Sequence, residues 1–543
     1  MSETTVKKKL NRWKGGTVLG VKLGLGALLV AGFTWFMAGS VSLPVRTWRE
    51  GQVAPSTVYA PWDFTVQERD HQVQVQRGEL LVSKGERLTA AHVARLNALN
   101  QTQNFSKTEW PWLGAFLLAC LFTAVGAIYI KQYEPKIWAA PRQLLLITVV
   151  VSLILLVSRL VLASPFVPPW IPVASVAMLL SMLLNPRLGI LTGLLATGLV
   201  ILMGRVDFPL VIGLSAGCFV GAYGVQGIRR RIDFFRAGLM TGLAQGLALF
   251  GSNLLVESPV MEALTAGLAG LGSGILSGLV TFCLLPLCES LFGLITEVTL
   301  VELSDLNHPL LKELSVKAPG TYHHSLIVAN LAEAACQVVG ANALLARVGC
   351  YFHDIGKMLH PEYFVENQSP KASRHDRLSP SMSSLLILNH VKEGIELARS
   401  AHLNQAIIDF IPGHHGTGLI YYFYRRAMEE VEDQTHLKEE GFRYPGPKPQ
   451  ERETAVALLA DSVEAATRAL SQKSPARIQE VVRRILNNKF IDGQLDECEL
   501  TLKDLEKISE AFQRVLAGIY HRRIEYPKAP GDEESSDPVV DVG

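Results

Sequence analysis

The chain divides into two halves with different hydrophobic patterning. Residues 112–295 are almost uncharged and apolar over long stretches, whereas residues 296–543 form a polar sequence of mixed charge, as in ordinary soluble domains. About 20 consecutive apolar residues can cross a bilayer as a helix. The pattern therefore predicts a membrane helix bundle followed by a soluble domain.

The apolar runs predict about eight membrane spans. The first, at residues 18–37, follows five basic residues between positions 7 and 14, and it indicates an uncleaved anchor rather than a signal peptide. We expect the last span to continue as a helix from Phe282 into Glu302, because no obvious helix breaker follows Pro286. The seven later spans are expected at residues 112–131, 143–163, 169–184, 188–204, 209–226, 237–256 and 265–295.

Loop charges predict the orientation of these spans. Most basic loop residues fall on one side of the bundle, including Lys136, Arg187 and the cluster at 229–236, whereas the opposite loops carry only Arg205. Because cytoplasmic loops are enriched in Lys and Arg, residues from 296 onward are expected in the cytoplasm of a multi-pass protein of the cell membrane. The opposite side then holds a short extracytoplasmic segment, residues 39–110, with a helix expected at 82–99.

The soluble part shows helical periodicity and no convincing strand alternation. The predicted fold class is therefore all-α: a polytopic membrane helix bundle followed by an all-helical domain. Residues 526–543 lack apolar content and are expected to be disordered. The expected parts are the anchor (1–38), the extracytoplasmic segment (39–110), the seven-span region (111–296), the soluble domain (297–525) and the tail (526–543).

Composition narrows the function only a little. The net charge of +1 says little about partners, and no nucleic-acid polymer is expected. The seven cysteines form no CxxC spacing, so neither a zinc ribbon nor a disulfide framework is indicated. The spans offer Arg159 near a span end and Glu289 in the last helix, but no histidine, which gives little support for a proton or ion relay. The many glycines there indicate close helix packing or, alternatively, a ligand pocket between helices.

The chemistry concentrates around His353 and Asp354, which follow an apolar run at residues 344–352. Taken alone, such a pair could be a hydrogen-bonded core pair. However, buried carboxylates need a partner or a metal, and imidazole and carboxylate ligands suit Mn, Fe or Zn. An ordered series of such residues extends on both sides and predicts a metal site: His324, His353, Asp354, His390, His414, His415 and Asp461.

These residues carry a resemblance to a known family. Residues 320–325 (Gly-Thr-Tyr-His-His-Ser), 353–357 (His-Asp-Ile-Gly-Lys) and 414–417 (His-His-Gly-Thr) resemble motifs of HD-domain metal-dependent phosphohydrolases. The match extends to the membrane-anchored family that joins a multi-span receptor-like region to a cytoplasmic HD domain and hydrolyses cyclic di-AMP. No Gly-Tyr-Pro signature follows His415, which favours this family over the related cyclic di-GMP hydrolases. The segment 39–110 is much shorter than in the family, which puts its sensing function in doubt.

The resemblance implies a pair of divalent metal ions, Mn or Fe, sharing Asp354. His324, His353 and Asp461 would complete one ligand set, and His390, His414 and His415 the other, with His323 outside both. Asp354 and Lys357 are the implied catalytic residues, Lys357 reaching a phosphate oxygen of a cyclic dinucleotide; otherwise it is a solvated lysine at a helix end. Two alternatives stay open: a hydrolase of another nucleotide, such as cyclic di-GMP or (p)ppGpp, and a catalytically silent nucleotide-binding receptor. A homodimer also stays open.

Overall fold

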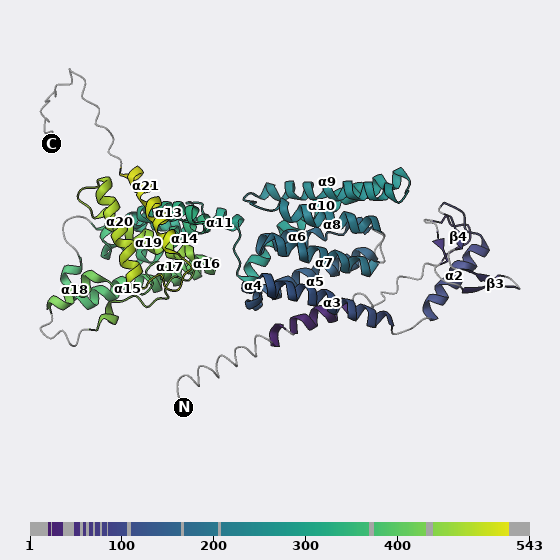
Figure 1. The fold of residues 1–543 in the computed structure, drawn as a ribbon, viewed down its shortest axis with the longest axis horizontal. Coiled ribbons are helices and arrows are strands. Elements are labelled where there is room, and N and C mark those ends of the chain that lie inside the picture. The colour runs from purple at the N-terminus through teal and green to yellow at the C-terminus, as the bar shows by residue number, and fades with distance from the viewer. Residues whose placement is uncertain are drawn as a thin grey trace, which may run out of the picture. The chain divides into compact units, whose positions relative to one another are not determined.

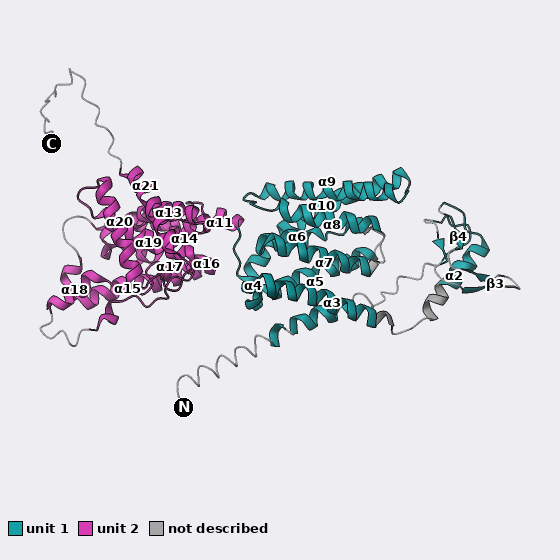
Figure 2. Ribbon diagram, in the orientation of Figure 1, with its two compact units in different colours: residues 1–296 teal, residues 297–543 magenta. Residues whose placement is uncertain are grey.

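The computed structural model divides the chain into two compact units, Met1–Thr296 and Glu297–Gly543 (Figure 2). The basic N-terminus and the tail expected to be disordered lie outside the described residues. The structure describes residues 20–35 except 23, and 48–520 except 55–57, 61–63, 69–70, 77–78, 84, 106–109, 164–167, 205–207, 369–373 and 431–437.

The first unit is built mainly from long apolar helices that run side by side in Figure 1. Seven of them correspond to the seven spans expected between residues 112 and 295. They are α3 (Trp110–Tyr133), α5 (Pro141–Ala163), α6 (Ala174–Leu183), α7 (Pro186–Gly204), α8 (Phe208–Gly224), α9 (Arg231–Leu255) and α10 (Val260–Phe292), with the short α4 (Pro135–Ala139) and η1 (Pro168–Trp170) between them.

Among the described residues, four helices are both long and apolar enough to cross a membrane: α3, α5, α7 and α10. Three further apolar helices are shorter, namely Gly20–Trp35, α6 and α8. Helix α9 is 25 residues long but carries charges in its first turns and polar residues such as Gln245. By length and composition alone, half of the eight predicted spans therefore meet the requirement.

Glycines bring α9 and α10 into backbone contact. A Cβ atom on Gly274 would clash with the backbone of Gly242, and one on Gly278 would lie 2.8 Å from the Cα atom of Gly238. Small residues allow membrane helices to approach closely and gain van der Waals contact. The close-packing interpretation of the span glycines is confirmed at this helix pair.

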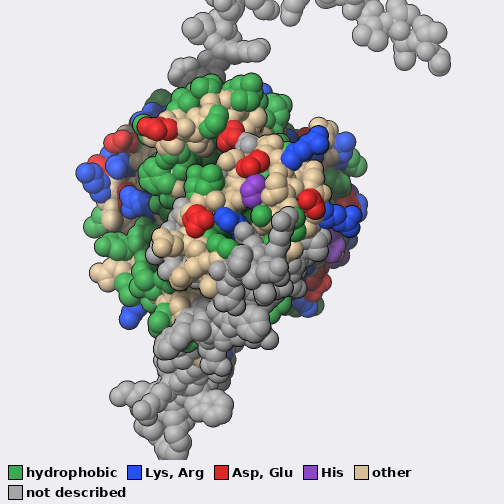
Figure 3. All heavy atoms as spheres, turned by 90° about the vertical axis from the view of Figure 1, so that its right-hand side faces the viewer, with side chains coloured by type: hydrophobic (Ala, Val, Ile, Leu, Met, Phe, Trp, Pro, Cys, Tyr) green, Lys and Arg blue, Asp and Glu red, His purple; other side chains and the backbone are tan. Residues whose placement is uncertain are grey.

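Large apolar side chains remain exposed on the outer faces of these helices. Leu117 is 57% exposed on α3, and Leu247 is 71% exposed on α9. Figure 3 views the molecule from one end, where hydrophobic side chains occupy much of the visible described surface and charged ones lie among them. Exposed apolar helix faces suit contact with lipid rather than water.

The predicted continuous helix from Phe282 into Glu302 is wrong. Helix α10 does pass through Pro286, but it ends at Phe292 because Gly293 adopts a left-handed conformation with φ of 67°. The amide of Leu294 donates to the carbonyl of Glu289 at 3.2 Å, and the Glu289 carboxylate accepts from the amide of Thr296. These bonds satisfy a helix end. A new helix, α11 (Glu297–Leu303), begins the second unit.

The segment expected to be extracytoplasmic contains strands that the prediction omitted. Strands β1 (Val58–Tyr59) and β4 (Leu80–Val82) pair antiparallel, as do β2 (Phe64–Glu68) and β3 (His71–Val75). Helix α2 (Ala90–Phe105) packs against β2 and β4, so the helix predicted at residues 82–99 is wrong at its beginning. Residue 82 ends a strand, and the Thr89 hydroxyl accepts from the amide of His92, which starts the helix later.

The second unit is helical, as predicted. Its longest helices meet around a core that includes the fully buried Phe352, Phe410 and Phe512. The helices are α12 (Pro309–Lys317), α13 (Pro319–Val339), α14 (Ala343–Phe352), α15 (Pro380–Ser400), α16 (Gln405–Ile408), α17 (Phe410–Gly413), α18 (Tyr421–Glu430), α19 (Arg452–Arg468), α20 (Pro475–Ile491) and α21 (Leu502–Ile519). Short 3₁₀ segments join them: η2 (Ile355–Leu359), η3 (Pro361–Tyr363), η4 (Val365–Asn367), η5 (Arg374–Arg377) and η7 (Glu439–Phe442).

Candidate metal centre

The second unit brings all seven predicted ligand residues together. His324 lies on α13, His390 on α15 and Asp461 on α19, whereas the other four follow the ends of helices. Ligand atoms within 4.8 Å of one another form two groups that share Asp354. The first group is His324, His353, Asp354 and Asp461, and the second is Asp354, His390, His414 and His415.

Asp354 stands between the two groups because α14 ends just before it. The helix stops at Phe352, and Asp354 has φ of −113° and ψ of 16° before the 3₁₀ turn η2 begins. The break frees the carboxylate to face the centre, and Gly356 keeps η2 against α15, where a Cβ atom would clash with the carbonyl of His390.

The two carboxylate oxygens of Asp354 face different histidines. Oδ2 lies 3.2 Å from Nε2 of His353 and 3.6 Å from Nε2 of His324. Oδ1 lies 3.4 Å from Nε2 of His390 and 3.4 Å from Nε2 of His414. One carboxylate thus contributes one oxygen to each group, which is the arrangement that a pair of metal ions needs.

Several ligand atoms are buried without a hydrogen bond. Among the described residues these include Oδ1 of Asp354 and Nε2 of His353, His390, His414 and His415. Leaving such atoms unpaired costs roughly 1–3 kcal/mol each. Neutral imidazole nitrogens and carboxylate oxygens are good ligands for divalent transition metals. The donor set therefore fits one or more metal ions.

The opposite nitrogens of these histidines are already occupied. Nδ1 of His353, His390 and His414 lies 2.7, 2.5 and 3.0 Å from backbone carbonyls of Cys350, Ile387 and Phe410. Each carbonyl belongs to the residue three or four positions earlier in the chain. A proton held on Nδ1 by such a bond leaves Nε2 as the free ligand atom. The three rings are thus oriented before any metal binds.

His324 is held differently, by a side chain that sequence analysis missed. Its Nδ1 lies 2.5 Å from a carboxylate oxygen of Glu464, and its Nε2 lies 3.1 Å from Asp461. Glu464 follows Asp461 by three residues on α19, so both carboxylates lie on one helix face. This three-residue spacing is the sequence feature that could have identified Glu464 as part of the site. A carboxylate behind a ligand histidine fixes its orientation and makes it more basic.

Electrostatics separate His324 from His390. Burial lowers the pKa of His390 to about 4, so this ring is neutral at pH 7. Burial also disfavours the charged form of His324, but hydrogen bonds to Asp461 and Glu464 outweigh it and raise its pKa to about 10. The Asp461 carboxylate stays ionised because burial is outweighed by His324 and His415, which hold its pKa well below its usual range.

Lys357 is not the solvated lysine that one prediction allowed. Its side chain is 11% exposed, and its Nζ lies 2.7 Å from Asp354 and 2.9 Å from Glu366. Burial by itself would lower the pKa of Lys357, but these carboxylates raise it above its ordinary value. Glu366 also lies 3.8 Å from Arg468. Sequence analysis missed Glu366, because η4 reaches the site only through the tertiary fold.

Tyr444 and His323 lie next to ligand residues but belong to neither ligand group. The ring of Tyr444 stacks on His415 with centroids 4.0 Å apart. His323, expected outside the ligand sets, is exposed and belongs to neither group.

An HD-type metal-ligand series in a helical unit, downstream of an apolar helix bundle, defines a class of membrane proteins with a hydrolase domain. The family described as 7TM receptor with intracellular HD hydrolase matches residues 109–296, and the HD domain matches residues 321–466. The chain belongs to this family of seven-span receptor-like proteins with an HD domain, as predicted.

Two curated relatives share the name cyclic-di-AMP phosphodiesterase PgpH. The protein from Bacillus subtilis (strain 168) is 36% identical over 84% of this chain and 66% of its own length. The protein from Listeria monocytogenes serotype 1/2a (strain 10403S) is 37% identical over 84% of this chain and 64% of its own length. The chain thus spans just under two thirds of these relatives. A crystal structure of the L. monocytogenes PgpH HD domain in complex with cyclic-di-AMP is 49% identical, covering 40% of this chain and 100% of that one, with a TM-score of 0.38.

Proposed function

We propose that this protein is a membrane-bound, metal-dependent phosphodiesterase that hydrolyses cyclic di-AMP to linear pApA and so regulates the level of this second messenger. The observation that carries the proposal is the convergence of seven ligand residues in two groups around Asp354. The names of the two PgpH relatives support the substrate. The cell membrane, with the HD domain on the cytoplasmic side, is the location that the basic loops support.

Two divalent ions, Mn or Fe, suit the site. His324, His353, Asp354 and Asp461 would hold one ion, and Asp354, His390, His414 and His415 the other. When bound, such ions supply an activated water nucleophile and positive charge near the phosphate oxygens. The chain itself supplies the rest: carbonyls and Glu464 that orient the histidine rings, and a buried setting that limits competing bulk water.

Lys357 has two roles in this proposal. Its contact with Asp354 keeps that carboxylate turned toward both groups. Its ammonium, fixed also by Glu366, places a positive charge where a phosphate oxygen of the substrate can bind. The scissile bond is the one between phosphorus and a 3′ oxygen, and its cleavage opens the ring.

The test is a substrate panel on the purified full-length protein loaded with Mn or Fe. Cyclic di-AMP, cyclic di-GMP and (p)ppGpp are supplied separately, and products are separated by chromatography. We expect pApA from cyclic di-AMP at a rate well above that for the other nucleotides, and its loss after chelation. A folded, metal-loaded protein that turns over none of them would favour the silent receptor, and preference for another nucleotide would overturn the substrate assignment.

A further inference from the structure

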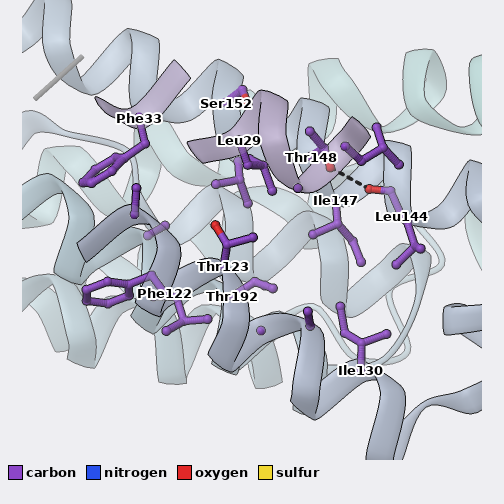
Figure 4. A pocket seen from close by; sticks show the side chains of 18 of the residues that line it. Leu29, Phe33, Phe122, Thr123, Ile130, Leu144, Ile147, Thr148, Ser152 and Thr192 are labelled. Carbon is purple, nitrogen blue, oxygen red and sulfur yellow. Dashed lines mark hydrogen bonds between the residues drawn. The ribbon is translucent and has the colours of Figure 1, made fainter. Parts of the chain in front are cut away.

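A cavity of about 160 Å³ lies inside the first unit, among the helix Gly20–Trp35, α3, α5 and α7 (Figure 4). Its side chains come from these four helices and, with Trp138, from α4. Leu29, Phe122 and Ile147 are among those drawn around it in Figure 4. The cavity lies far along the sequence from the HD domain and shares no residue with the metal centre.

Most side chains that line this cavity are apolar, and two of its hydroxyl groups are already bonded. The Thr148 hydroxyl donates to the carbonyl of Leu144 at 2.9 Å, and the Thr192 hydroxyl donates to that of Leu188 at 2.7 Å. Both hydroxyls are thus already bonded within their own helices. Phe33 is also buried in the wall. An apolar wall of this kind favours an apolar ligand.

One end of the cavity carries a positive charge. Lys22 lines it, and its ammonium lies 4.4 Å from the ring centroid of Trp138, which lines it too. No Asp or Glu occurs among the described residues that line the cavity. Trp and Lys side chains often mark the boundary between membrane and water. The charge complements an anionic group located at that boundary.

The length of the cavity matches one leaflet. Lys22 and Phe33 both line it and are eleven residues apart on one helix, which at about 1.5 Å per residue is roughly 16 Å. The hydrocarbon core of a bilayer is about 30 Å thick, so this is about half of it. We propose that the cavity binds an acyl chain of an anionic phospholipid from the leaflet on the side of Lys22, with the head group near Lys22.

The experiment uses the full-length protein in phosphatidylcholine vesicles. A small fraction of phosphatidylglycerol with a photoreactive group on its acyl chain is added, and labelled peptides are mapped by mass spectrometry. We expect labels to concentrate in residues 22–33 and the facing parts of α3, α5 and α7. Ser152→Phe, which fills the cavity, should cut this labelling severalfold. Val149→Phe is the matched control, because Val149 is 44% exposed on the same helix.

Variants of Lys22 test whether the lipid head group lies near this residue. Lys22→Gln should lower the preference for the phosphatidylglycerol probe over a phosphatidylcholine probe by about fivefold, the effect of one basic residue at an anionic surface. Lys22→Arg should keep the preference and shows that the fold survives a change at this position. Equal labelling by the two probes, labels spread evenly over exposed helix faces, or equal effects of the two Phe variants would each overturn the proposal.

Discussion

The two units bury polar side chains in opposite ways. In the apolar bundle, the hydroxyls of Ser158, Thr241 and Thr281 donate to carbonyls four residues earlier in the same helix. In the HD domain, Nε2 of His390 and Nε2 of His414 each lie 3.4 Å from Oδ1 of Asp354, and none of these three atoms has a hydrogen-bond partner. A buried group whose bonding capacity is already used has no chemistry left to perform. Single unpaired hydroxyls such as that of Ser181 also occur in the bundle. The difference teaches that the convergence of several unpaired ligand atoms on one point, rather than burial itself, marks the site.

The helices of the two units also pack in different ways. Helices α9 and α10 meet through glycines whose backbones touch, so their contact depends on having no side chain. In the HD domain Gly349 instead makes room for the ring of Phe410, and large side chains fill the core. Lipid offers no hydrophobic drive for helix association, whereas water does. Substitutions should therefore destabilise the two units for different reasons: overpacking at glycine contacts in the bundle, and loss of side-chain packing in the HD domain.

The largest expected effect is that of Asp354→Ala. The substitution removes the only carboxylate shared by both ligand groups among the described residues. Phosphodiesterase activity should fall by well over about 100-fold, beyond the range typical of residues that only orient a ligand. Bound metal, measured by mass spectrometry of the purified protein, should fall with it. Asp409→Ala, an exposed position in the same domain, is the control and should change neither value.

Glu464→Gln should have the next largest effect. The side chain keeps its size but loses the charge that orients His324 and raises its basicity. Metal affinity should weaken by about 10- to 100-fold, measured by titration with a competing chelator. The exposed Glu510→Gln provides the comparison. If Glu464→Gln bound metal as tightly as the unchanged protein, the orienting role would be refuted.

Gly274→Ala tests the other half of the comparison. The added methyl group meets the backbone of Gly242, which cannot rotate away as a side chain can. Overpacking of this kind costs about 1–3 kcal/mol. Thermal unfolding in detergent should shift downward, while metal content stays unchanged. Gly251→Ala, on α9 with open space around its position, should leave the transition in place; equal shifts in both variants would argue against backbone contact as the cause.

Tyr444→Leu should give the smallest effect. It keeps apolar volume but removes the ring stacked on His415. Aromatic pairs contribute about 0.5–1.5 kcal/mol, so metal affinity should weaken about two- to tenfold. Chelator titration measures this change as well, with the exposed Tyr421→Leu as control. An effect as large as that of Glu464→Gln would mean that Tyr444 orients His415 more strictly than stacking allows.

Sequence alone predicted the ligand series, the two ligand sets implied by family resemblance, and most helices of the HD domain. These features depend on local periodicity and on residue types that are costly to bury unpaired, such as Asp461 in an apolar helix. The spacing of Glu464 from Asp461 was also visible in the sequence, but the contact between Glu464 and His324 was not. The assignment of Lys357 as catalytic stays a prediction.

Tertiary structure decided what local patterns leave open. Helix α10 ends at the left-handed Gly293, where hydrogen bonds from the amides of Leu294 and Thr296 to Glu289 complete the helix end. The presence of a glycine in the sequence does not by itself predict these bonds. Glu366 meets Lys357 only because η4 packs beside α13. The two Asp354 oxygens likewise face different histidines only because four separate helices, α13, α14, α15 and α17, meet at the site. Contacts between residues far apart in the chain are set by packing, and no local pattern encodes them.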